Sequence, residues 1–513
     1  MAFRAGPSRA SRIGPVATLH PAPLRRRHHD RLVITLRPVL NILGLLIFGL
    51  GAGMLLPAVV DVAARNPDWQ AFVISALFTG MSGLLLAISC AGELGSSLSI
   101  RQAFLLTALA WLTLPAFGAL PFLWLGISYA DAVFEAVSGF TTTGSTILIG
   151  LDGLAPGLLL WRSVLQWMGG VGIIVMALVL LPYLQVGGMQ LFKTESSDKG
   201  EKVVSRSADL VRLIALIYFG LTMLCAALYW VTGMNAFDAV NHAMTTLSTG
   251  GYSTHDASFA YFTNPLTGWI CIVFMIAGAS PFSLMIQAMR GRPLLLWRDP
   301  QIKALLCLLA ATSFVAAIYL GITQEIGLHE ALLRTSFNFT SIVTTTGFAL
   351  GDYTLWGPPI VGIVLMLTFA GGCTGSTSGG IKMFRFIVFF GTLRNHLRMM
   401  VRTHRVVSTR YADTQLTPDI AFSVLAFLVA YLGSVGAITL ILTFFGLDAM
   451  TAITGAATAI GNVGPGLGDV IGPAGNFSSL PDGAKWVLSL AMLLGRLELF
   501  TVLVLLDPEF WSR

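Results

Sequence analysis

Long apolar stretches alternate with short polar connections along most of the chain. A helix needs about 20 apolar residues to cross a bilayer. Ten stretches reach that length, at residues 38–60, 69–91, 103–127, 158–181, 210–231, 266–286, 304–322, 360–390, 420–445 and 485–506. The pattern predicts an all-α polytopic membrane protein with ten transmembrane helices.

Four further stretches are apolar but too short to span, and each begins with an acidic residue. They cover residues 131–140, 238–247, 330–343 and 448–460. We expect each to be a short re-entrant helix. Its acid would cap free N–H groups and complement the positive end of the helix dipole. The four acids are Asp131, Asp238, Glu330 and Asp448.

A Gly/Thr-rich segment follows each short helix. The four segments are Phe-Thr-Thr-Thr-Gly-Ser at 140–145, Leu-Ser-Thr-Gly-Gly-Tyr at 247–252, Val-Thr-Thr-Thr-Gly-Phe at 343–348 and Ile-Gly-Asn-Val-Gly-Pro at 460–465. Aligned on one glycine, they recur about every 100 residues, which indicates an internal repeat. The fourth segment departs from the Thr-Thr-Thr-Gly pattern of the first and third segments.

The repeat divides the chain into units of helix, re-entrant segment and helix. These units would cover residues 101–185, 208–290, 301–392 and 416–508. A transmembrane helix pair at 38–100 and a basic tail at 1–37 would precede them.

The four segments point to a cation pathway. A ring of extended loops can turn backbone carbonyls inward and replace the hydration shell of a cation. Glycine suits such loops because it adopts backbone angles that a side chain forbids. One Gly/Thr segment alone would be taken for close helix packing, but four in register favour the pathway.

The second helix of the third repeat is interrupted by small residues. Ten of the twelve residues from Gly371 to Lys382 are Gly, Ser, Thr or Cys, a composition that a regular helix tolerates poorly. We interpret this segment as a flexible gating loop, with a static kink as the alternative. The second helices of the other repeats carry Gly169-Gly170, Gly278-Ala279-Ser280 and Gly495-Arg496 at the aligned place.

Arg496 is a charge inside an apolar stretch, where it is costly unless it faces protein or water. Two roles remain open: a structural pair with Glu498 or another acid, or an electrostatic barrier and latch at the gating loop. The alignment with the Gly-rich interruption favours the second role.

Four other polar residues near the loops invite smaller roles. His242 and His255 flank the second loop, and histidine as a residue type can handle protons, but hydrogen-bonded loop histidines are the favoured interpretation. Glu135 and Arg334 lie in the re-entrant helices and are expected to brace them.

Composition and charge set the class and the topology. Of 513 residues, 55% are hydrophobic and 11% charged, and the mean hydropathy is +0.78, which excludes a soluble protein. Lys and Arg gather in the connections 185–209, 289–303 and 382–415. The positive-inside rule then places both termini in the cytoplasm, with the four loops opening outward. The basic tail is interpreted as topogenic, with lipid or nucleic-acid contact less favoured.

Several motifs resemble a known family. They are Ser-Thr-Gly-Gly-Tyr-Ser-Thr-His-Asp at 248–256, Gly-Gly-Cys-Thr-Gly-Ser-Thr-Ser-Gly-Gly-Ile-Lys at 371–382, Gly-Asn-Val-Gly-Pro-Gly at 461–466 and Gly-Arg-Leu-Glu-Leu-Phe at 495–500. Over about residues 38–510 the chain resembles the Trk/Ktr/HKT superfamily of potassium transporters. Within it, the chain is most similar to the TrkH membrane subunits of bacterial Trk uptake systems.

The resemblance implies a potassium filter lined by carbonyls of Thr142, Thr143, Gly144, Thr249, Gly250, Gly251, Thr345, Thr346, Gly347, Asn462, Val463 and Gly464. It implies an intramembrane gate made of Gly371, Gly372, Gly375, Gly379, Gly380 and Arg496. Gly144, where sodium-selective relatives often carry serine, favours potassium as the ion.

The resemblance also implies a homodimer in the bacterial inner membrane, joined by cytosolic nucleotide-binding regulatory subunits. The sequence holds no nucleotide motif, so we expect no cofactor on this chain and any nucleotide on the partner.

Three alternatives stay open from the residues alone. The first is a potassium symporter coupled to protons or sodium, or a sodium-permissive transporter of the same fold. The second is a structural subunit without transport. The third is an intramembrane hydrolase using Ser376 or Cys373, which is disfavoured because no base lies near them in sequence. We therefore expect a transporter and not an enzyme.

Overall fold

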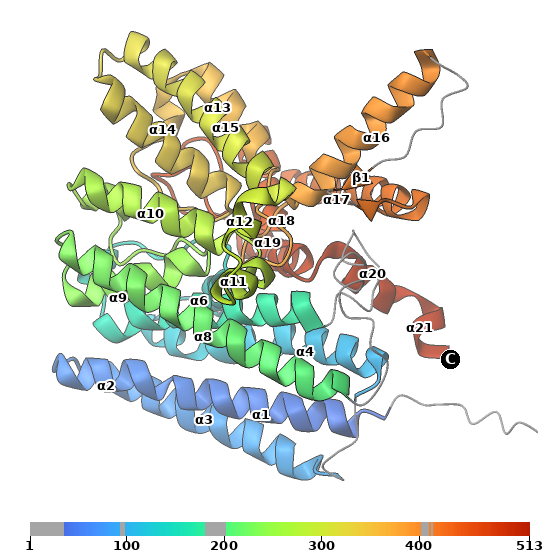
Figure 1. The fold of residues 1–513 in the computed structure, drawn as a ribbon. Helices are drawn as coiled ribbons and strands as arrows, with labels where there is room; N and C mark the ends of the chain where they lie inside the picture. The colour runs from blue at the N-terminus through green and yellow to red at the C-terminus, as the bar shows by residue number, and fades with distance from the viewer. Residues whose placement is uncertain (1–34, 93–97, 180–201, 402–409, 412–413, 513) are drawn as a thin grey trace, which may run out of the picture.

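The computed structural model describes residues 35–92, 98–179, 202–401, 410–411 and 414–512 (Figure 1). The basic tail up to residue 34 and most of the connection at 185–209 lie outside the described residues. Helices make up nearly all the regular structure. In the described part of the chain the only strands are the two-residue pair β1 (Arg410–Tyr411) and β2 (Thr414–Gln415). The all-α prediction is confirmed.

The described part of the chain begins with a hairpin of helices at one edge of the molecule, blue in Figure 1. It consists of α1 (Arg37–Gly53), its continuation α2 (Leu55–Ala63) and α3 (Trp69–Ser89). Small residues set their spacing, because a Cβ at Gly44 would lie 2.5 Å from the backbone nitrogen of Ala87, and one at Gly83 would lie 2.4 Å from that of Phe48. Glycine contacts of this kind are typical of membrane helix pairs.

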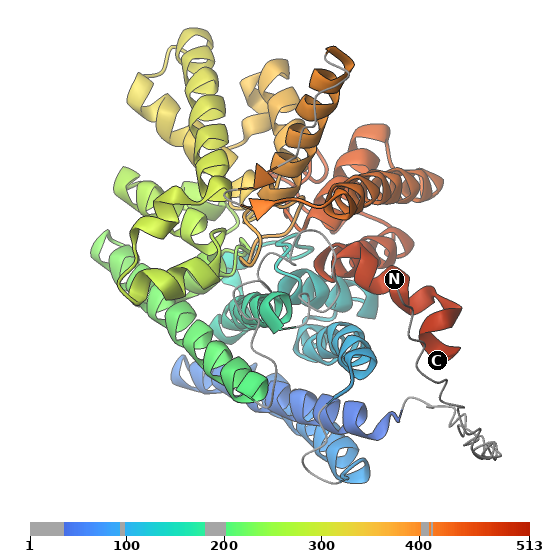
Figure 2. The ribbon, with the colours of Figure 1, turned by 45° about the vertical axis from the view of Figure 1, so that its right-hand side comes forward.

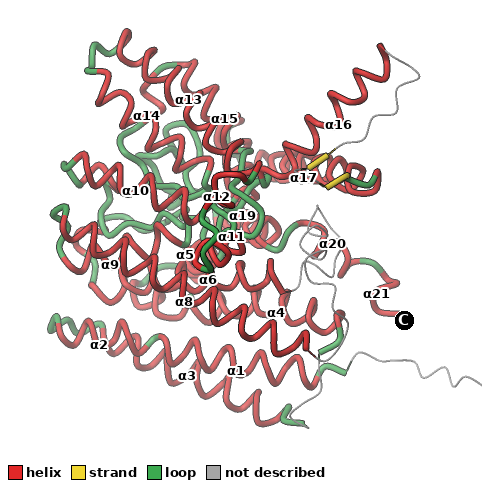
Figure 3. The backbone as a smooth tube through the Cα atoms, viewed as in Figure 1, coloured by secondary structure: helices red, strands yellow, loops and turns green. Residues whose placement is uncertain are grey.

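The rest of the chain repeats one order of elements, a first helix, a short helix and a second helix. The first helices are α4 (Ile100–Gly118), α8 (Lys202–Val231), α13 (Pro300–Thr323) and α17 (Pro418–Phe444). The short helices are α5 (Tyr129–Phe140), α9 (Ala236–Leu247), α14 (Leu328–Val343) and α18 (Ala449–Gly461). Figure 2 shows these units around the middle of the molecule, and Figure 3 shows loops gathered there.

Three of the four second helices are broken. Their segments are α6 (Pro156–Val179); α10 (Pro265–Gly278) with α11 (Phe282–Met289); α15 (Pro358–Thr368) with α16 (Met383–Val401); and α19 (Asp482–Arg496) with α20 (Leu499–Leu506). The bends are 99° between α10 and α11 and 102° between α19 and α20. Short helices α12 (Leu294–Arg298) and α21 (Pro508–Ser512) and four 3₁₀ turns complete the described elements: η1 (Leu120–Leu125), η2 (Leu151–Gly153), η4 (Ser258–Tyr261) and η5 (Tyr353–Trp356).

The glycines aligned in the second helices pack against the short helices. A Cβ at Gly169 or at Gly495 would lie 1.9 Å from the carbonyl oxygen of the residue it faces, Phe140 or Ile460 respectively. Helix α6 nevertheless continues through Gly169 without a break. These glycines therefore share a role in close packing. The breaks in the second helices of three repeats are a separate feature.

Seven of the described helices are long and apolar enough to cross a membrane, or up to nine if each bent pair is one span. The predicted stretch at 360–390 is divided into α15 and α16 by the Gly-rich loop, so ten spans remain a prediction. Many outward-facing side chains are apolar, for example Phe78, Met81 and Leu85 of α3, each about three-fifths exposed. Such a surface fits a lipid environment.

The expected acidic caps are correct for one short helix only. Asp448 caps α18, accepting a hydrogen bond from the Thr451 N–H at 3.1 Å. Ser128 caps α5 and Asn235 caps α9. The remaining acids lie in the first helical turn instead, where they still complement the positive helix end: Asp131, Asp238 and Glu330.

Candidate functional site

The four loops after the short helices share one backbone conformation. Each has a left-handed residue with φ between 51° and 57°, followed two positions later by a glycine with φ between 78° and 109°. The left-handed residues are Thr142, Thr249, Thr345 and Asn462, and the glycines are Gly144, Gly251, Gly347 and Gly464. Asparagine tolerates this conformation better than threonine, so the fourth loop keeps the common backbone despite its different sequence.

The N–H groups of the loops point back into their own short helices. The residue between the left-handed residue and the glycine donates to a helix carbonyl at 2.7–3.0 Å in every repeat. These middle residues are Thr143, Gly250, Thr346 and Val463, which donate to Ser138, Thr245, Ser341 and Thr458. The backbone N–H groups of these middle residues therefore have partners within their own repeat. The carbonyls of the same residues are not used in these bonds.

The loops close into a ring. A Cβ at each glycine would meet the middle-residue carbonyl oxygen of a neighbouring loop at 2.8 Å or less. The pairs are Gly144 with Gly250 at 2.1 Å, Gly251 with Thr346 at 1.9 Å, Gly347 with Val463 at 2.4 Å and Gly464 with Thr143 at 2.8 Å. The contacts run from loop one to two, three, four and back to one. The structure therefore brings all twelve candidate filter residues together.

The ring carbonyls have almost no partners within the described protein. None of the twelve backbone carbonyls accepts a hydrogen bond from a described backbone N–H. Two of these carbonyls accept one from a side chain, that of Gly250 from Gln166 at 2.7 Å and that of Gly464 from Ser145 at 2.8 Å. Buried carbonyls normally have partners. A ring of buried carbonyls without protein partners is suited to bind a dehydrated cation.

The Gly-rich loop of the third repeat packs directly against this ring. The Thr345 hydroxyl accepts from the Gly379 N–H at 2.7 Å, and the Thr249 hydroxyl lies 3.2 Å from that of Thr377. The loop is also tied to α10, because the Thr377 hydroxyl donates to the Gly278 carbonyl at 2.8 Å. All the candidate gate glycines lie in this contact region: Gly371, Gly372, Gly375, Gly379 and Gly380.

Arg496 contacts the loop and not the acid considered for it. Arg496 is 2% exposed, and its guanidinium donates to the Thr377 carbonyl at 2.9 Å. Glu498 instead pairs with Arg385. Lys382 donates to the Ser378 carbonyl of the same loop.

A cavity of about 20 Å³ lies among these groups, close to the space of one water molecule. Its lining includes Lys382, Arg496 and the single carboxylate of Glu498. Two cationic side chains and one carboxylate therefore line this small cavity next to the ring.

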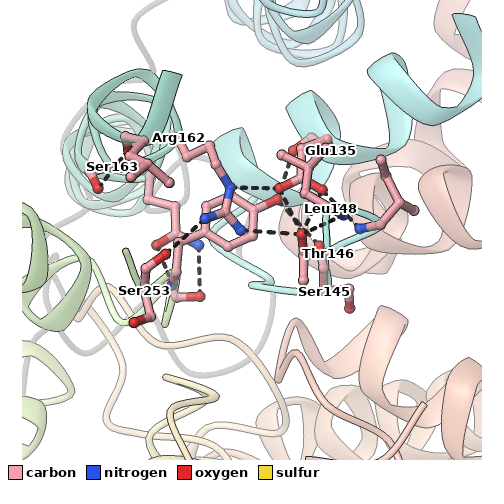
Figure 4. A network of polar contacts seen from close by, with 12 residues as sticks. Glu135, Ser145, Thr146, Leu148, Arg162, Ser163 and Ser253 are labelled. Carbon is pink, nitrogen blue, oxygen red and sulfur yellow. Dashed lines mark hydrogen bonds and ion pairs between the residues drawn. The ribbon is translucent and has the colours of Figure 1, made fainter. Parts of the chain in front are cut away.

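A buried ion pair between α5 and α6 supports the ring (Figure 4). Glu135 of α5 and Arg162 of α6 lie 2.8 Å apart and are almost fully buried. Arg162 also donates to the Ser253 carbonyl at 2.8 Å, and Glu135 accepts from the Ile147 N–H at 3.0 Å. The bracing role expected for Glu135 fits these contacts. Sequence reasoning missed Arg162, although a lone charge in an apolar stretch was a signal for it.

The other candidates have ordinary structural contacts. Arg334 pairs with Glu330 one turn away at 2.5 Å. Both ring nitrogens of His242 have partners, at 2.9 Å each. In the outer loops, His255 bonds the Asp152 carboxylate and holds the pKa of that carboxyl below its usual range. These contacts agree with the favoured structural interpretation of each residue.

The hydrolase alternative finds no support in the loop. The Ser376 hydroxyl donates to the Cys373 carbonyl at 2.6 Å. Among the described residues, no histidine is a hydrogen-bond partner of either side chain, so the base that nucleophilic catalysis needs is not in place.

These features define a class: an all-α membrane protein whose four helix–loop–helix units present a closed ring of carbonyls next to a small-residue loop. A family model described as TrkH, cation transport protein, matches residues 68–512. The chain belongs to this family, which confirms the resemblance seen in the sequence and is a family of transporters.

Individual relatives cover almost the whole chain. It is 45% identical over 490 residues to the Trk system potassium uptake protein TrkI of Halomonas elongata, covering 94% of this chain and 99% of the relative. It is 36% identical over 488 residues to the Trk system potassium uptake protein TrkH of Escherichia coli strain K12, covering 93% and 99%. The crystal structure of the potassium transporter TrkH from Vibrio parahaemolyticus matches with a TM-score of 0.86 at 33% identity, covering 93% of this chain and 100% of that one.

Proposed function

We propose that this chain is the pore-forming subunit of a Trk-type potassium uptake system in the bacterial inner membrane. The observation that carries the proposal is the closed ring of buried carbonyls that have almost no protein partners. Such a ring can replace the hydration shell of a potassium ion. The names of the relatives, potassium uptake proteins of Trk systems, support the choice of ion.

In this proposal the twelve loop residues form the selectivity filter, and residues 371–380 with Arg496 form the gate. The contact of Arg496 with Thr377 supports the pairing of these two parts. A buried guanidinium next to an ion path repels cations, because the low dielectric hardly screens it. Movement of the loop would have to break this hydrogen bond, so Arg496 acts as both barrier and latch.

The partners follow from the same assignment. The chain would form a homodimer and assemble with a cytosolic nucleotide-binding regulatory subunit, which would hold any nucleotide. Both termini would lie in the cytoplasm, and the loops would open outward. The excess of Lys and Arg in the connections at 289–303 and 382–415 supports this orientation.

The test is ion uptake into proteoliposomes that contain the purified full-length chain. We expect selective uptake of ⁸⁶Rb⁺ down a potassium gradient, with little ²²Na⁺ uptake, and neither in protein-free liposomes. Uptake against the potassium gradient, driven only by an imposed proton or sodium gradient, would establish the coupled alternative instead. Absence of flux under all gradients would contradict the proposal and favour a structural subunit.

A further inference from the structure

A glutamine of the first repeat reaches into the filter loop of the second. Gln166 lies on α6 and is fully buried. Its side-chain amide donates to the Gly250 carbonyl at 2.7 Å, and its oxygen accepts from the Tyr252 N–H at 3.0 Å. Both ends of one rigid amide thus hold the backbone on either side of Gly251.

The held carbonyl belongs to the ring itself. The Gly250 oxygen is the one that faces Gly144 and closes the contact between loops one and two. A carbonyl oxygen has two lone pairs. One serves Gln166, which leaves the second for an ion.

Loops one and three fix the same position by their own side chains. Loops one and three carry threonines there, and each hydroxyl bonds the threonine two residues earlier: Thr143 with Thr141 at 2.7 Å, and Thr346 with Thr344 at 2.8 Å. Loop four carries Val463, which is buried. Only loop two has a glycine at this place.

Gln166 occupies the space that a side chain at position 250 would need. A Cβ built on Gly250 would lie 2.3 Å from the Gln166 side-chain carbon, and its three nearest atoms all belong to Gln166. The glycine and the glutamine are therefore complementary. Two consecutive glycines would otherwise leave this part of the ring the most flexible.

We propose that Gln166 is a positioning residue that sets ion selectivity, because it fixes the Gly250 carbonyl in the ring. The inference rests on the proposed function. With the glutamine in place, the carbonyl stays at the distance that suits potassium. Without it, the Gly250–Gly251 segment can turn inward and accommodate the smaller sodium ion.

The experiment measures the K⁺/Na⁺ permeability ratio of the full-length chain in planar bilayers, from reversal potentials with potassium on one side and sodium on the other. Gln166→Leu removes both hydrogen bonds. Gln166→Glu, nearly isosteric, keeps an acceptor for the Tyr252 N–H, but its carboxylate cannot donate to the Gly250 carbonyl. We expect the ratio to fall about tenfold in both variants, the effect of losing one buried hydrogen bond.

A matched control is available in another buried glutamine. Gln301 also bridges two groups, accepting from the Thr374 N–H at 2.9 Å and donating to the Tyr411 hydroxyl at 3.0 Å, but it does not contact the ring. Gln301→Leu can change the size of the current but is expected to leave the ratio unchanged.

A compensating pair adds a rescue. In Gln166→Ala the space beside Gly250 is free, so adding Gly250→Thr supplies the side chain that loops one and three carry. We expect the double variant to recover part of the ratio lost in Gln166→Ala alone.

The outcomes separate this inference from the proposed function. If the unmodified chain is not potassium-selective, the proposed function fails. If it is selective and both Gln166 variants keep its ratio, or lose only current, Gln166 has a merely structural role and the inference is wrong. If Gln166→Leu does not fold, Gln166→Glu and the Gly250→Thr rescue decide the question in the same way.

Discussion

Replacing Glu135 by leucine tests the brace behind the ring. The change leaves the guanidinium of Arg162, which is 1% exposed, without its counter-charge. Breaking one partner of a buried pair costs about 3–5 kcal/mol. The loss of an acceptor for the Ile147 N–H adds about 1 kcal/mol. We expect a large fall in the midpoint of thermal unfolding of the purified chain in detergent, together with weaker ion selectivity.

The double variant Glu135→Leu, Arg162→Met is the decisive comparison. It removes both charges, so it should be more stable than Glu135→Leu alone. Arg334→Met is the control, because its pair with Glu330 is 39% and 52% exposed and should change stability by less than about 1 kcal/mol. The single variant Arg162→Met completes the cycle. If the stability lost in the double variant equals the sum of the losses in Glu135→Leu and Arg162→Met, the two residues are not coupled and the reasoning is refuted.

Three further changes test other parts of the account. Arg496→Met should raise ⁸⁶Rb⁺ flux several-fold if the guanidinium is a barrier; unchanged flux in folded protein would contradict this role. Gly347→Ser should raise sodium permeability, since φ is 86° there and a side chain would press on the ring; an unchanged K⁺/Na⁺ ratio would argue against the filter register. Gly169→Ala should destabilise the chain by about 1–3 kcal/mol through its clash with the Phe140 carbonyl. Gly172→Ala, whose nearest contact is at 3.8 Å, serves as the control in the same thermal assay.

The sequence predicted the four short helices well. Each short helix begins within two residues of the predicted start, because an acidic residue lies in or next to the first turn of every one. The aligned glycines identified the loops because glycine adopts a positive φ at little cost, whereas most other residues are disfavoured in that conformation. Local rules of this kind need no knowledge of distant contacts.

The errors concern helix caps and helix breaks, which the local sequence does not determine alone. Of the four acids expected to cap their helices, three do not, because the N-cap position lies three residues earlier, as Ser128 does before Asp131. Gly169 was aligned with helix breaks, yet α6 is continuous, and its glycine packs against the Phe140 carbonyl just as Gly495 of the broken helix packs against Ile460.

The residues that shape the site from outside its loops could not be predicted. Gln166 and Arg162 lie one turn apart on α6, and both reach the second loop. Nothing in the local pattern of an apolar helix says which loop its few polar side chains will meet. Their partners are 84 and 91 residues away in sequence and become neighbours only through the fold.

The central claim is that the four loops form one potassium site. The most direct measurement is an anomalous difference map from crystals of the full-length chain grown with Rb⁺ in place of K⁺. We predict peaks on the axis enclosed by the carbonyls of the middle residues, Thr143, Gly250, Thr346 and Val463. Peaks only outside the ring, or none inside it at full Rb⁺ replacement, would contradict the account.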